Sequence, residues 1–460
     1  MTLREYVDSL KEKTVAVIGI GVSNTPLLRL LMENNIRVTA CDKRLRSDLG
    51  ELADELEAGG VKLQLGPDYL DGLDQDVIFR TPGMRPDVAQ LLAAQEKGSK
   101  ITSEMEVFFD VCPCSIIAVT GSDGKTTTTT MIAELLRASG RTVHVGGNIG
   151  TPLLAQTDEM DSSDSVVLEL SSFQLMTMKK SPHIAVVTNL SPNHLDMHKG
   201  MEEYVASKEN IFLHQCKADV AVFNLDNEIT CEQSSRAKGS VRMFSRRSSV
   251  DNGVYLRGDE IVRSCDGVET VVMTVDDIKL PGIHNVENYM AAIAALEGLV
   301  DDETIRTFAR EFGGVEHRIE LVRTIRGVRY YNDSIASSPT RTIAGLRSFK
   351  EKVILIAGGY DKNIPFEELG PEVVEHVKLL VLCGATADKI RTAVETAPTY
   401  SVGNPMILTA SNLSQAVELA HTHAVEGDVV TLSPACASFD QFPNFMARGK
   451  AFKAIVNGLQ

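Results

Sequence analysis

Short, continuous apolar runs recur along this chain, and each of them closes on glycine or on a polar turn. Runs of this kind, without polar alternation, are typical of strands that are buried on both faces of a sheet. Helix-length segments separate them, so the pattern predicts an α/β fold with parallel sheets. The runs are residues 115–119, 165–170, 184–189, 219–224, 353–357, 379–382 and 428–432.

The length of 460 residues exceeds what one compact core supports. Strand patterns at 14–18 and 37–42 flank a helix and predict an opening βαβ unit. Glycine-punctuated pieces over about 240–280 indicate an antiparallel flap, and an alanine-rich helix is expected from Asn288 to Leu299. We predict three α/β domains in series, which are residues 1–111, 112–315 and 316–460.

Charge and cysteine content narrow the functional classes. The 62 acidic residues outnumber the 46 basic ones, and this net charge of −16 disfavours binding to a nucleic-acid backbone. The eight cysteines are too scattered for a disulfide scaffold. Met1 to Lys13 lacks the apolar core of a signal peptide, and no stretch has the apolar length that spans a bilayer. A cytoplasmic location without membrane insertion is therefore expected.

The strongest local motif is GSDGKT at residues 121–126, between an apolar strand pattern and a helix pattern. Glycines allow backbone N–H groups to close around phosphate oxygens, and a helix N-terminus adds positive potential. Lys125 would offset phosphate charge, and the Thr126 hydroxyl could bind magnesium. Val119 stands where the first glycine of the usual phosphate loop would be, so the motif is a short form. The alternative is an ordinary strand-to-helix turn with a solvated lysine.

A second glycine turn, Gly19-Ile20-Gly21, resembles a dinucleotide fingerprint in which Asn24 replaces the third glycine. Asp42 follows about twenty residues later, where a ribose-binding carboxylate would stand. This pattern is compatible with a phosphorylated nucleoside, with a dehydrogenase cofactor, or with a tight βα turn alone.

Further polar residues follow other strand patterns. Glu169 ends one strand, and His194 lies on a loop after the next. A carboxylate facing a phosphate loop can hold Mg²⁺, whereas a surface salt bridge is the alternative for Glu169. By spacing alone, Lys208 is a helical lysine on a solvated face. Cys436 is interpreted as a small buried thiol rather than as a nucleophile, because no histidine pairs with it in a known signature.

Taken together, these segments resemble the Mur ligase family over essentially the whole chain, with the motifs in the family's order. The fold that this resemblance implies is α/β with three domains: an N-terminal Rossmann-like parallel sheet, a central P-loop ATPase-like domain and a C-terminal Rossmann-like domain. The motifs are GSDGKTT at 121–127, GNIG at 147–150, ELSSFQ at 169–174, the segments 189–196 and 433–445, HNVEN at 284–288, HR at 317–318 and NDS at 332–334.

The resemblance implies a role for each matching position. Lys125, Lys208 and His194 would be catalytic, and Lys208 would be carbamylated. The metal ligands would be Thr126, Glu169, His194 and Lys208. ATP would contact Gly121, Ser122, Asp123, Gly124, Lys125, Thr126, Thr127, Asn288, Arg318 and Asp333. A UDP-linked precursor would contact Val22, Ser23, Asp42, Lys43, Arg44, Thr81, Asn148 and Ser171. D-Glutamate would contact Ser337, Lys362, Ser438 and Phe445.

The implied activity is an ATP-dependent amide ligation through an acyl-phosphate. The form of residues 432–442 is similar to that of the D-glutamate-adding members, which implies D-glutamate and UDP-N-acetylmuramoyl-L-alanine as substrates, with ATP and two Mg²⁺ ions. A monomer is expected. The chain departs from the family pattern at Ile335, where a lysine is common, and at Ser337, where a threonine is more familiar. The rival interpretations are another Mur ligase, a folylpolyglutamate synthase-like ligase, or a nucleotide-binding oxidoreductase or regulatory switch.

Overall fold

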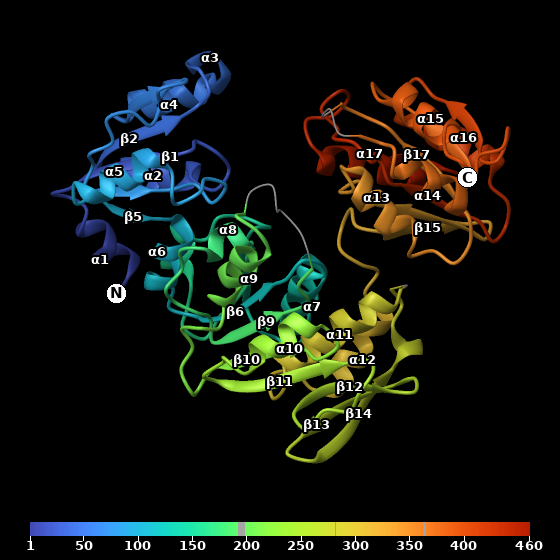
Figure 1. The fold of residues 1–460 in the computed structure, drawn as a ribbon, viewed down its shortest axis with the longest axis horizontal. Coiled ribbons are helices and arrows are strands. Elements are labelled where there is room, and N and C mark those ends of the chain that lie inside the picture. Colours follow the sequence, from blue (N-terminus) through green and yellow to red (C-terminus); the bar gives the residue numbers. More distant parts are fainter. Residues whose placement is uncertain (192–197, 281, 362–364) are drawn as a thin grey trace. The chain divides into compact units, whose positions relative to one another are not determined.

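Three sheets organise the chain in a computed structural model that describes residues 1–191, 198–280, 282–361 and 365–460 (Figure 1). The chain divides into two compact units. One comprises residues 1–277 and 284–308 and holds two of the sheets, and the other comprises residues 278–283 and 309–460 and holds the third. The prediction of an α/β fold with parallel sheets is confirmed.

The N-terminal sheet is parallel throughout, in the order β3-β2-β1-β4-β5. Its strands are β1 (Thr14–Ile18), β2 (Arg37–Asp42), β3 (Lys62–Leu65), β4 (Val77–Phe79) and β5 (Lys100–Thr102). Its helices are α1 (Leu3–Asp8), α2 (Thr25–Glu33), α3 (Arg46–Leu49), α4 (Glu51–Ala58), α5 (Ala89–Glu96) and α6 (Glu104–Val111).

The central sheet has the order β14-β13-β12-β11-β10-β9-β6-β8-β7. Its strands are β6 (Ser115–Thr120), β7 (Val143–Gly147), β8 (Ser165–Glu169), β9 (Ile184–Val187), β10 (Val220–Asn224), β11 (Ser240–Ser245), β12 (Gly253–Arg257), β13 (Glu260–Cys265) and β14 (Val268–Thr274). Its helices are α7 (Lys125–Ala138), α8 (Ser172–Leu175), α9 (Met201–Glu209), α10 (Glu228–Ser234), α11 (Ile283–Ala295) and α12 (Asp302–Glu311), with short 3-10 turns η1 (Leu154–Glu159) and η2 (Val275–Asp277).

The antiparallel flap and the alanine-rich helix differ in their bounds from the sequence-based predictions. The antiparallel flap consists of β12, β13 and β14, which extend the central sheet at its edge, whereas β11 remains parallel to both β10 and β12. The alanine-rich helix α11 runs from Ile283 to Ala295 rather than from Asn288 to Leu299. Gly282, with φ +102°, makes the turn before it, so the polar segment 284–288 forms the first turns of the helix.

The third sheet has the order β15-β16-β20-β17-β18-β19, in which β15 and β16 pair antiparallel and the pairs from β16 to β19 are parallel. Its strands are β15 (Glu320–Ile325), β16 (Val328–Asn332), β17 (Val353–Ala357), β18 (Val377–Leu382), β19 (Met406–Thr409) and β20 (Val429–Leu432). Its helices are α13 (Pro339–Leu346), α14 (Leu369–His376), α15 (Ala387–Glu395), α16 (Leu413–His423) and α17 (Phe445–Gly458).

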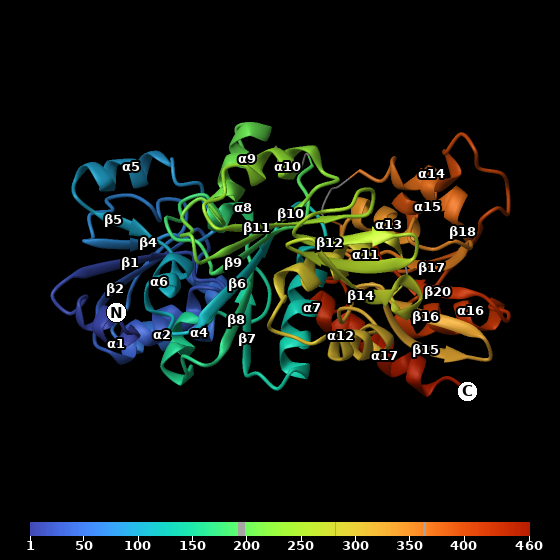
Figure 2. The ribbon, with the colours of Figure 1, turned by 90° about the horizontal axis from the view of Figure 1, so that it is seen from below.

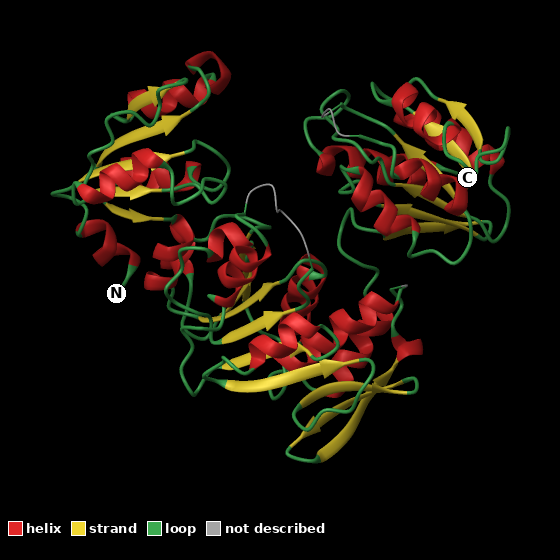
Figure 3. Ribbon diagram, in the orientation of Figure 1, coloured by secondary structure: helices red, strands yellow, loops and turns green. Residues whose placement is uncertain are grey.

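Continuous apolar strands in this unit are explained by helices on both faces of the sheet, as Figures 2 and 3 show. Along β17, Leu355 packs in one cluster with residues of α14, whereas Ile354 and Ile356 pack in another with residues of α16 and α17. Successive strand residues point to opposite faces, so a strand covered on both sides has no polar alternation.

One hydrophobic core joins the N-terminal and central sheets. It contains Val15 and Val17 of β1, Ile116 and Ala118 of β6, and Phe108 of α6, the helix that leads from one sheet to the other (Figure 1). Because these apolar side chains are buried together, the two sheets stabilise each other.

We expect Phe108→Ala to destabilise this shared core by about 3–5 kcal/mol, because the ring is fully buried and its removal leaves a cavity. Chemical denaturation, followed by circular dichroism, measures the loss. Leu92→Ala is the matched control, since Leu92 is 44% exposed and its truncation should cost less than about 0.5 kcal/mol. Equal losses in the two variants would contradict a shared core centred on α6.

Candidate active site

A glycine turn connects β6 to α7 at the carboxyl edge of the central sheet. Gly121 has φ +147° and Gly124 has φ +78°. A Cβ atom on Gly121 would lie 2.0 Å from the Thr188 hydroxyl oxygen, and one on Gly124 would lie 2.5 Å from Asn288 Oδ1. The turn therefore requires glycine at both positions. It ends at the N-terminus of α7, where the backbone N–H groups of the first turn and the helix dipole favour an anion.

The end of β9 holds this loop in shape. The Ser122 backbone N–H donates to Asn189 O at 2.8 Å, and the Asp123 N–H donates to Asn189 Oδ1 at 3.0 Å. The Thr188 hydroxyl donates to Asp123 O at 2.6 Å. Ser122 Oγ also donates to Ser191 O at 2.9 Å. A loop braced in this way has little conformational freedom left to lose when a phosphate binds.

Two lysines converge on the loop carbonyls. Lys125 Nζ donates to Gly121 O at 3.0 Å and to Ser122 O at 2.8 Å. Lys208 Nζ, on the adjacent helix α9, donates to the same Gly121 O at 2.9 Å and to Thr120 Oγ1 at 3.1 Å. Spacing alone predicted that Lys208 lies on a solvated face. This prediction is wrong, because the residue is only 2% exposed.

The surroundings of Lys208 disfavour its charged form. Burial, and then the nearby charge of Lys125, hold the pKa of the Lys208 ammonium well below its usual value. The amine lies 5.0 Å from the centre of the Tyr204 ring. The Tyr204 hydroxyl is in turn 2.9 Å from Ser122 Oγ. A buried amine that loses its proton readily is a nucleophile.

Glu169 stands on the opposite side of β6, because β8 pairs with β6 in a register that sets Glu169 beside Val119. The carboxylate is buried and accepts the Thr126 hydroxyl at 2.6 Å and the Asn148 amide at 2.8 Å. Gly147 lets the Asn148 segment approach closely, since a Cβ there would lie 2.1 Å from Glu169 O. These oxygens are hard ligands of the kind that Mg²⁺ prefers.

Other predicted ATP positions surround the same loop. Asn288 Oδ1 accepts the Thr128 hydroxyl at 3.2 Å, and its amide donates to Asn285 Oδ1 at 3.1 Å. Thr127 is buried in the first turn of α7. Within the described ranges, no three His, Cys, Asp or Glu side chains gather as a ready metal site. His194, a predicted metal ligand, lies outside the described residues.

The N-terminal turn is organised around Asp42. Its carboxylate accepts the Ile20 N–H at 2.7 Å, and it accepts three N–H groups of Arg44 at 2.9 to 3.0 Å. This partnership lowers the pKa of the Asp42 carboxyl. Asn24, in place of the third glycine, ties the turn by donating to Ile18 O at 3.0 Å. Because four N–H groups already donate to its oxygens, the Asp42 carboxylate fixes the shape of this turn.

The remaining predicted precursor positions lie in this unit. Val22 is 81% exposed, Lys43 is exposed and Ser23 is partly exposed at the mouth of the N-terminal turn. Thr81 lies against Gly19, where a Cβ atom would come within 3.0 Å of it. Ser171 caps α8 by accepting the Gln174 N–H at 3.3 Å.

In the second unit, the carboxyl ends of β16, β20 and β17 come together because β20 lies between the other two strands. Asp333 accepts the Ser433 hydroxyl at 2.7 Å and the Ile319 N–H at 3.3 Å. Burial raises the pKa of the Asp333 carboxyl to about 7, and Arg318 acts against that rise. Polar residues that follow these strands therefore gather at this sheet edge.

Arg448, on α17, was not among the predicted site residues, yet it organises this edge. It is 4% exposed and donates to Ser334 O at 2.8 Å, Cys436 O at 3.1 Å and Ala437 O at 3.2 Å. Burial lowers the pKa of its guanidinium to about 10. Its position three residues after Phe445 in one helix places both on the same face, and that spacing is the signal that could have identified it.

The predicted D-glutamate positions surround this arginine. Phe445 O accepts the Ser334 hydroxyl at 2.8 Å, and the Phe445 ring meets His317 edge-on at 6.0 Å. Ser438 is buried and its carbonyl accepts the Phe442 N–H at 2.8 Å, whereas Ser337 is partly exposed. Lys362 lies outside the described residues.

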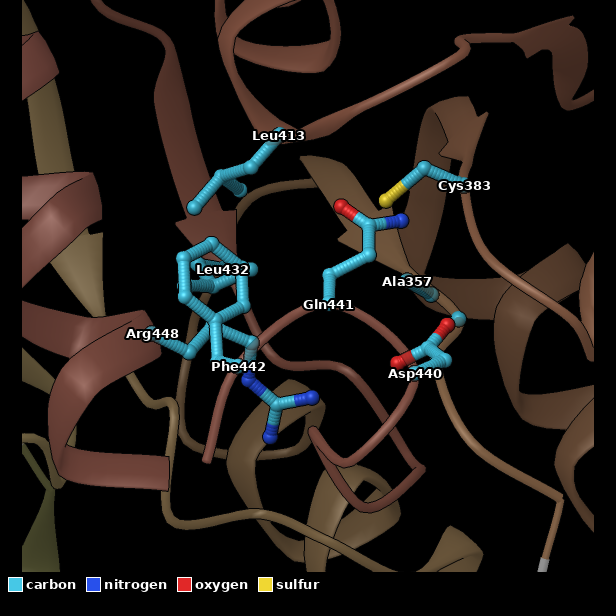
Figure 4. A pocket seen from close by; sticks show the side chains of 10 residues that line it. Ala357, Cys383, Leu413, Leu432, Asp440, Gln441, Phe442 and Arg448 are labelled. Carbon is cyan, nitrogen blue, oxygen red and sulfur yellow. The ribbon is translucent and has the colours of Figure 1, made fainter. Parts of the chain in front are cut away.

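A small pocket opens beside Arg448, between the Asp440–Phe442 turn and Cys383, as Figure 4 shows. Its volume, about 10 Å³, is the space of a single water molecule. This pocket by itself does not accommodate an amino acid. The neighbouring Cys436 thiol is 3.0 Å from Thr386 Oγ1, and burial raises its pKa to about 11, which keeps it protonated and inert as a nucleophile.

The braced glycine turn, with lysine and a buried carboxylate on either side of one strand end, defines a phosphate-binding α/β protein. Family models confirm and sharpen this class. One for the Mur ligase middle domain matches residues 119–296, and one for the Mur ligase, glutamate ligase domain matches residues 317–436. The chain belongs to the Mur ligase family, so it is a ligase.

Similar proteins extend over the full length. The chain is 53% identical to UDP-N-acetylmuramoylalanine--D-glutamate ligase of Acetivibrio thermocellus, covering 100% of this chain and 99% of that protein. It is 52% identical to the ligase of the same name from Clostridium novyi, with the same coverage.

Solved structures agree on the fold. UDP-N-acetylmuramate-alanine ligase from Thermotoga maritima has a TM-score of 0.58 at 18% identity, covering 97% of this chain and 99% of that one. Folylpolyglutamate synthase from Mycobacterium tuberculosis has a TM-score of 0.54 at 15% identity, covering 78% of this chain and 94% of that one. In the part of the chain that the structure describes, no helix is both long and apolar enough to cross a bilayer.

We expect Gly121→Ala to weaken ATP binding by more than about tenfold, because the new Cβ would displace Thr188 and strain a backbone at φ +147°. Titration calorimetry with a non-hydrolysable ATP analogue measures the change. Gly458→Ala, at the end of α17 with no atom near its Cβ position, is the control and should bind normally. Normal affinity in Gly121→Ala would contradict the role of the turn.

The raised pKa of the Asp333 carboxyl makes the stability of the fold depend on pH. In the unfolded chain its carboxyl has the ordinary pKa of about 3.9, so between about pH 4 and 7 the folded state holds a proton that the unfolded state has released. Stability therefore falls as the pH rises through this window. We expect Asp333→Asn to remove that part of the fall.

Thermal unfolding of the full chain at several pH values between about 4.5 and 7.5 tests this expectation. The melting midpoint of Asp333→Asn should rise relative to that of the parent as the pH increases. Glu418→Gln removes an exposed carboxylate of the same unit and should follow the parent. Parallel curves for Asp333→Asn and the parent would contradict the raised pKa.

Proposed function

We propose that this chain joins D-glutamate to UDP-N-acetylmuramoyl-L-alanine at the expense of ATP, a step in peptidoglycan precursor synthesis. The observation that carries the proposal is the braced, short phosphate loop in a chain that is 53% identical over its whole length to a ligase of that name. The similarity of residues 432–442 to the D-glutamate-adding form supports the choice of amino acid.

The chemistry proceeds in two balanced steps. A carboxylate oxygen of the muramoyl-alanine attacks the γ-phosphorus of ATP, the bond to the β-phosphate oxygen breaks, and ADP leaves with the formation of an acyl-phosphate. The D-glutamate amine then attacks the acyl carbon, inorganic phosphate leaves, and the amine proton passes to solvent or a base. Lys125 offsets the repulsion between the attacking carboxylate and the phosphates.

The oxygen donors beside the phosphate loop fit magnesium. The Thr126 hydroxyl and the Glu169 carboxylate are 2.6 Å apart and offer oxygen ligands beside the loop. We propose that they hold Mg²⁺ with His194 and ATP phosphates, and that a second ion uses Lys208 as its carbamate. When bound, the metal would neutralise charge that develops on the transferred phosphoryl group.

Carbamylation of Lys208 would resolve the crowding of two lysines at one carbonyl. A neutral Lys208 amine attacks CO₂, an N–C bond forms, and a proton is released, so a cation site becomes an anion. The burial of Lys208 and the repulsion from Lys125 support this step, because both favour the neutral amine.

The other site positions that the family resemblance implies belong to the same proposal. The UDP-linked precursor would lie along Val22, Ser23, Asp42, Lys43, Arg44, Thr81, Asn148 and Ser171, and D-glutamate along Ser337, Lys362, Ser438 and Phe445. Arg318, Asp333 and Asn288 would complete the ATP site. We further propose that domains 1–111, 112–315 and 316–460 carry these three sites, and that the enzyme is a cytoplasmic monomer.

A coupled assay tests the proposed activity. Phosphate release should require UDP-N-acetylmuramoyl-L-alanine, D-glutamate, ATP and Mg²⁺ together. L-Lysine, diaminopimelate and L-alanine, tried in place of D-glutamate, should not support it, and a folate with L-glutamate should not either. Release with one of these instead, or reduction of NAD without ATP use, would refute the assignment.

We expect Lys208→Ala to lose at least about 100-fold in kcat, since the amine that would be carbamylated is absent. Added formate or acetate should restore part of the rate by supplying a carboxylate in its place. Lys180→Ala removes an exposed lysine of the same unit and should show neither effect. Full activity of Lys208→Ala without added carboxylate would remove the carbamate proposal.

A further inference from the structure

The turn that follows β4 is held by two arginines, Arg80 and Arg85. Arg80 is 1% exposed, and its guanidinium donates to Thr81 O and Pro82 O at 3.3 Å and also to Met84 O. Burying a guanidinium is costly unless its donors are satisfied, and here the carbonyls of the turn satisfy them. Arg80 therefore fixes the shape of the turn that carries Thr81.

The same arginine reaches the central part of the unit. Its other nitrogen donates to the Thr177 hydroxyl at 3.2 Å, just after α8. Strand β4 belongs to the N-terminal sheet, whereas helix α8 follows β8 of the central sheet (Figure 2). A side chain that directly follows β4 thus ties the turn to the segment of α8, whose N-cap is Ser171.

Arg85 makes the second tie, to helix α9. Its two terminal nitrogens donate to the Glu203 carboxylate oxygens at 2.9 and 2.8 Å, and its Nε and one terminal nitrogen donate to Asp87 at 2.8 and 3.0 Å. The paired geometry matches the planar guanidinium to a carboxylate. The bonds from Arg85 lower the pKa of the Glu203 carboxyl to about 2, so Glu203 is ionised at neutral pH.

Glu203 connects α9 to α8 as well. Its Oε2 accepts the Lys199 N–H at 2.7 Å and lies 3.5 Å from His198 Nδ1. The other nitrogen of His198 is 2.9 Å from Ser172 Oγ, and the imidazole stacks on the Phe173 ring at 4.9 Å. Glu203 therefore belongs to a continuous polar and aromatic network across both helices.

Helix α9 also carries the groups that touch the phosphate loop. Tyr204 follows Glu203 directly, and its hydroxyl contacts Ser122 Oγ. Lys208 lies five residues after Glu203, and its Nζ donates to Gly121 O. Any shift of α9 moves these side chains relative to the loop, because a helix moves as a rigid element.

We propose that Arg80 and Arg85 are positioning residues that clamp the Thr81–Met84 turn onto α8 and α9, so that precursor binding at this turn sets the position of Lys208 beside the phosphate loop. The inference rests on the proposed function for the identity of the precursor. The clamp itself rests on the hydrogen bonds of Arg80 and Arg85 alone. Coupling of this kind is reciprocal, so the clamp also makes precursor affinity depend on the placement of α9.

Four variants test the clamp at its more exposed member. Arg85→Ala removes both bonds to Glu203, Glu203→Gln removes the charge while keeping the shape, and the double variant combines them. Arg85→Lys keeps the charge but loses the fork. Arg263→Ala is the matched control, because Arg263 pairs with Asp302 at 2.9 Å with similar exposure inside the central part of the unit.

Steady-state kinetics give the first measurement. The KM for UDP-N-acetylmuramoyl-L-alanine should rise on the order of tenfold in Arg85→Ala and in Glu203→Gln, and the double variant should rise no further. Arg85→Lys should fall between Arg85→Ala and the parent. The KM for D-glutamate should stay unchanged in all of them, and Arg263→Ala should match the parent. An unchanged precursor KM, or effects that multiply in the double variant, would overturn the coupling.

Amide hydrogen exchange on the unliganded protein gives the second measurement, and it needs no substrate. Exchange in residues 201–209 and in the turn after β4 should accelerate in Arg85→Ala but not in Arg263→Ala. Unchanged exchange in both segments would overturn the clamp. If the parent enzyme failed to ligate D-glutamate, the proposed function would fall, whereas the exchange result would still decide whether the clamp exists.

Discussion

The register of three neighbouring parallel strands is the constraint on which the central site depends. Strand β6 pairs with β8 on one side and β9 on the other, so the ends of all three meet at one edge. That pairing sets Glu169 beside the end of β6 and brings Thr188 against Gly121. The backbone hydrogen bonds between these strands thereby determine where the Glu169 carboxylate, the Thr188 hydroxyl and the glycine turn lie.

Electrostatics then shape what this edge can do. Two lysines share the carbonyl of Gly121, and one of them is almost fully buried. Burial removes hydration from the Lys208 ammonium, and the nearby charge of Lys125 repels it. Both effects lower the pKa of Lys208 below its usual value. In the second unit, burial also disfavours the charged form of a side chain. There the group is an acid, so burial raises the pKa of the Asp333 carboxyl.

Much of this arrangement was accessible from the sequence. Continuous apolar runs predicted the strands, and the polar residues after them predicted the site at the edge of the central sheet, because parallel strands share the edge at which they end. Local reasoning failed where partners come from distant segments. By spacing alone, Lys208 is a solvated helical lysine, and Arg448 lies outside the motifs, since the burial of the two side chains depends on β6 and on the 433–440 loop. The predicted start of α11 is five residues late because the polar residues 284–288 form its first turns.

The sequence by itself determined the α/β class, the strand ends, the short phosphate loop and the family, since apolar periodicity and motif spacing are local properties of the chain. Only the tertiary structure decided which side chains are buried together: the two lysines at one carbonyl, the occupied carboxylate of Asp42, and the arginines that tie the β4 turn to α8 and α9. Burial and charge pairing arise when segments far apart in sequence pack against each other, and no local pattern records that.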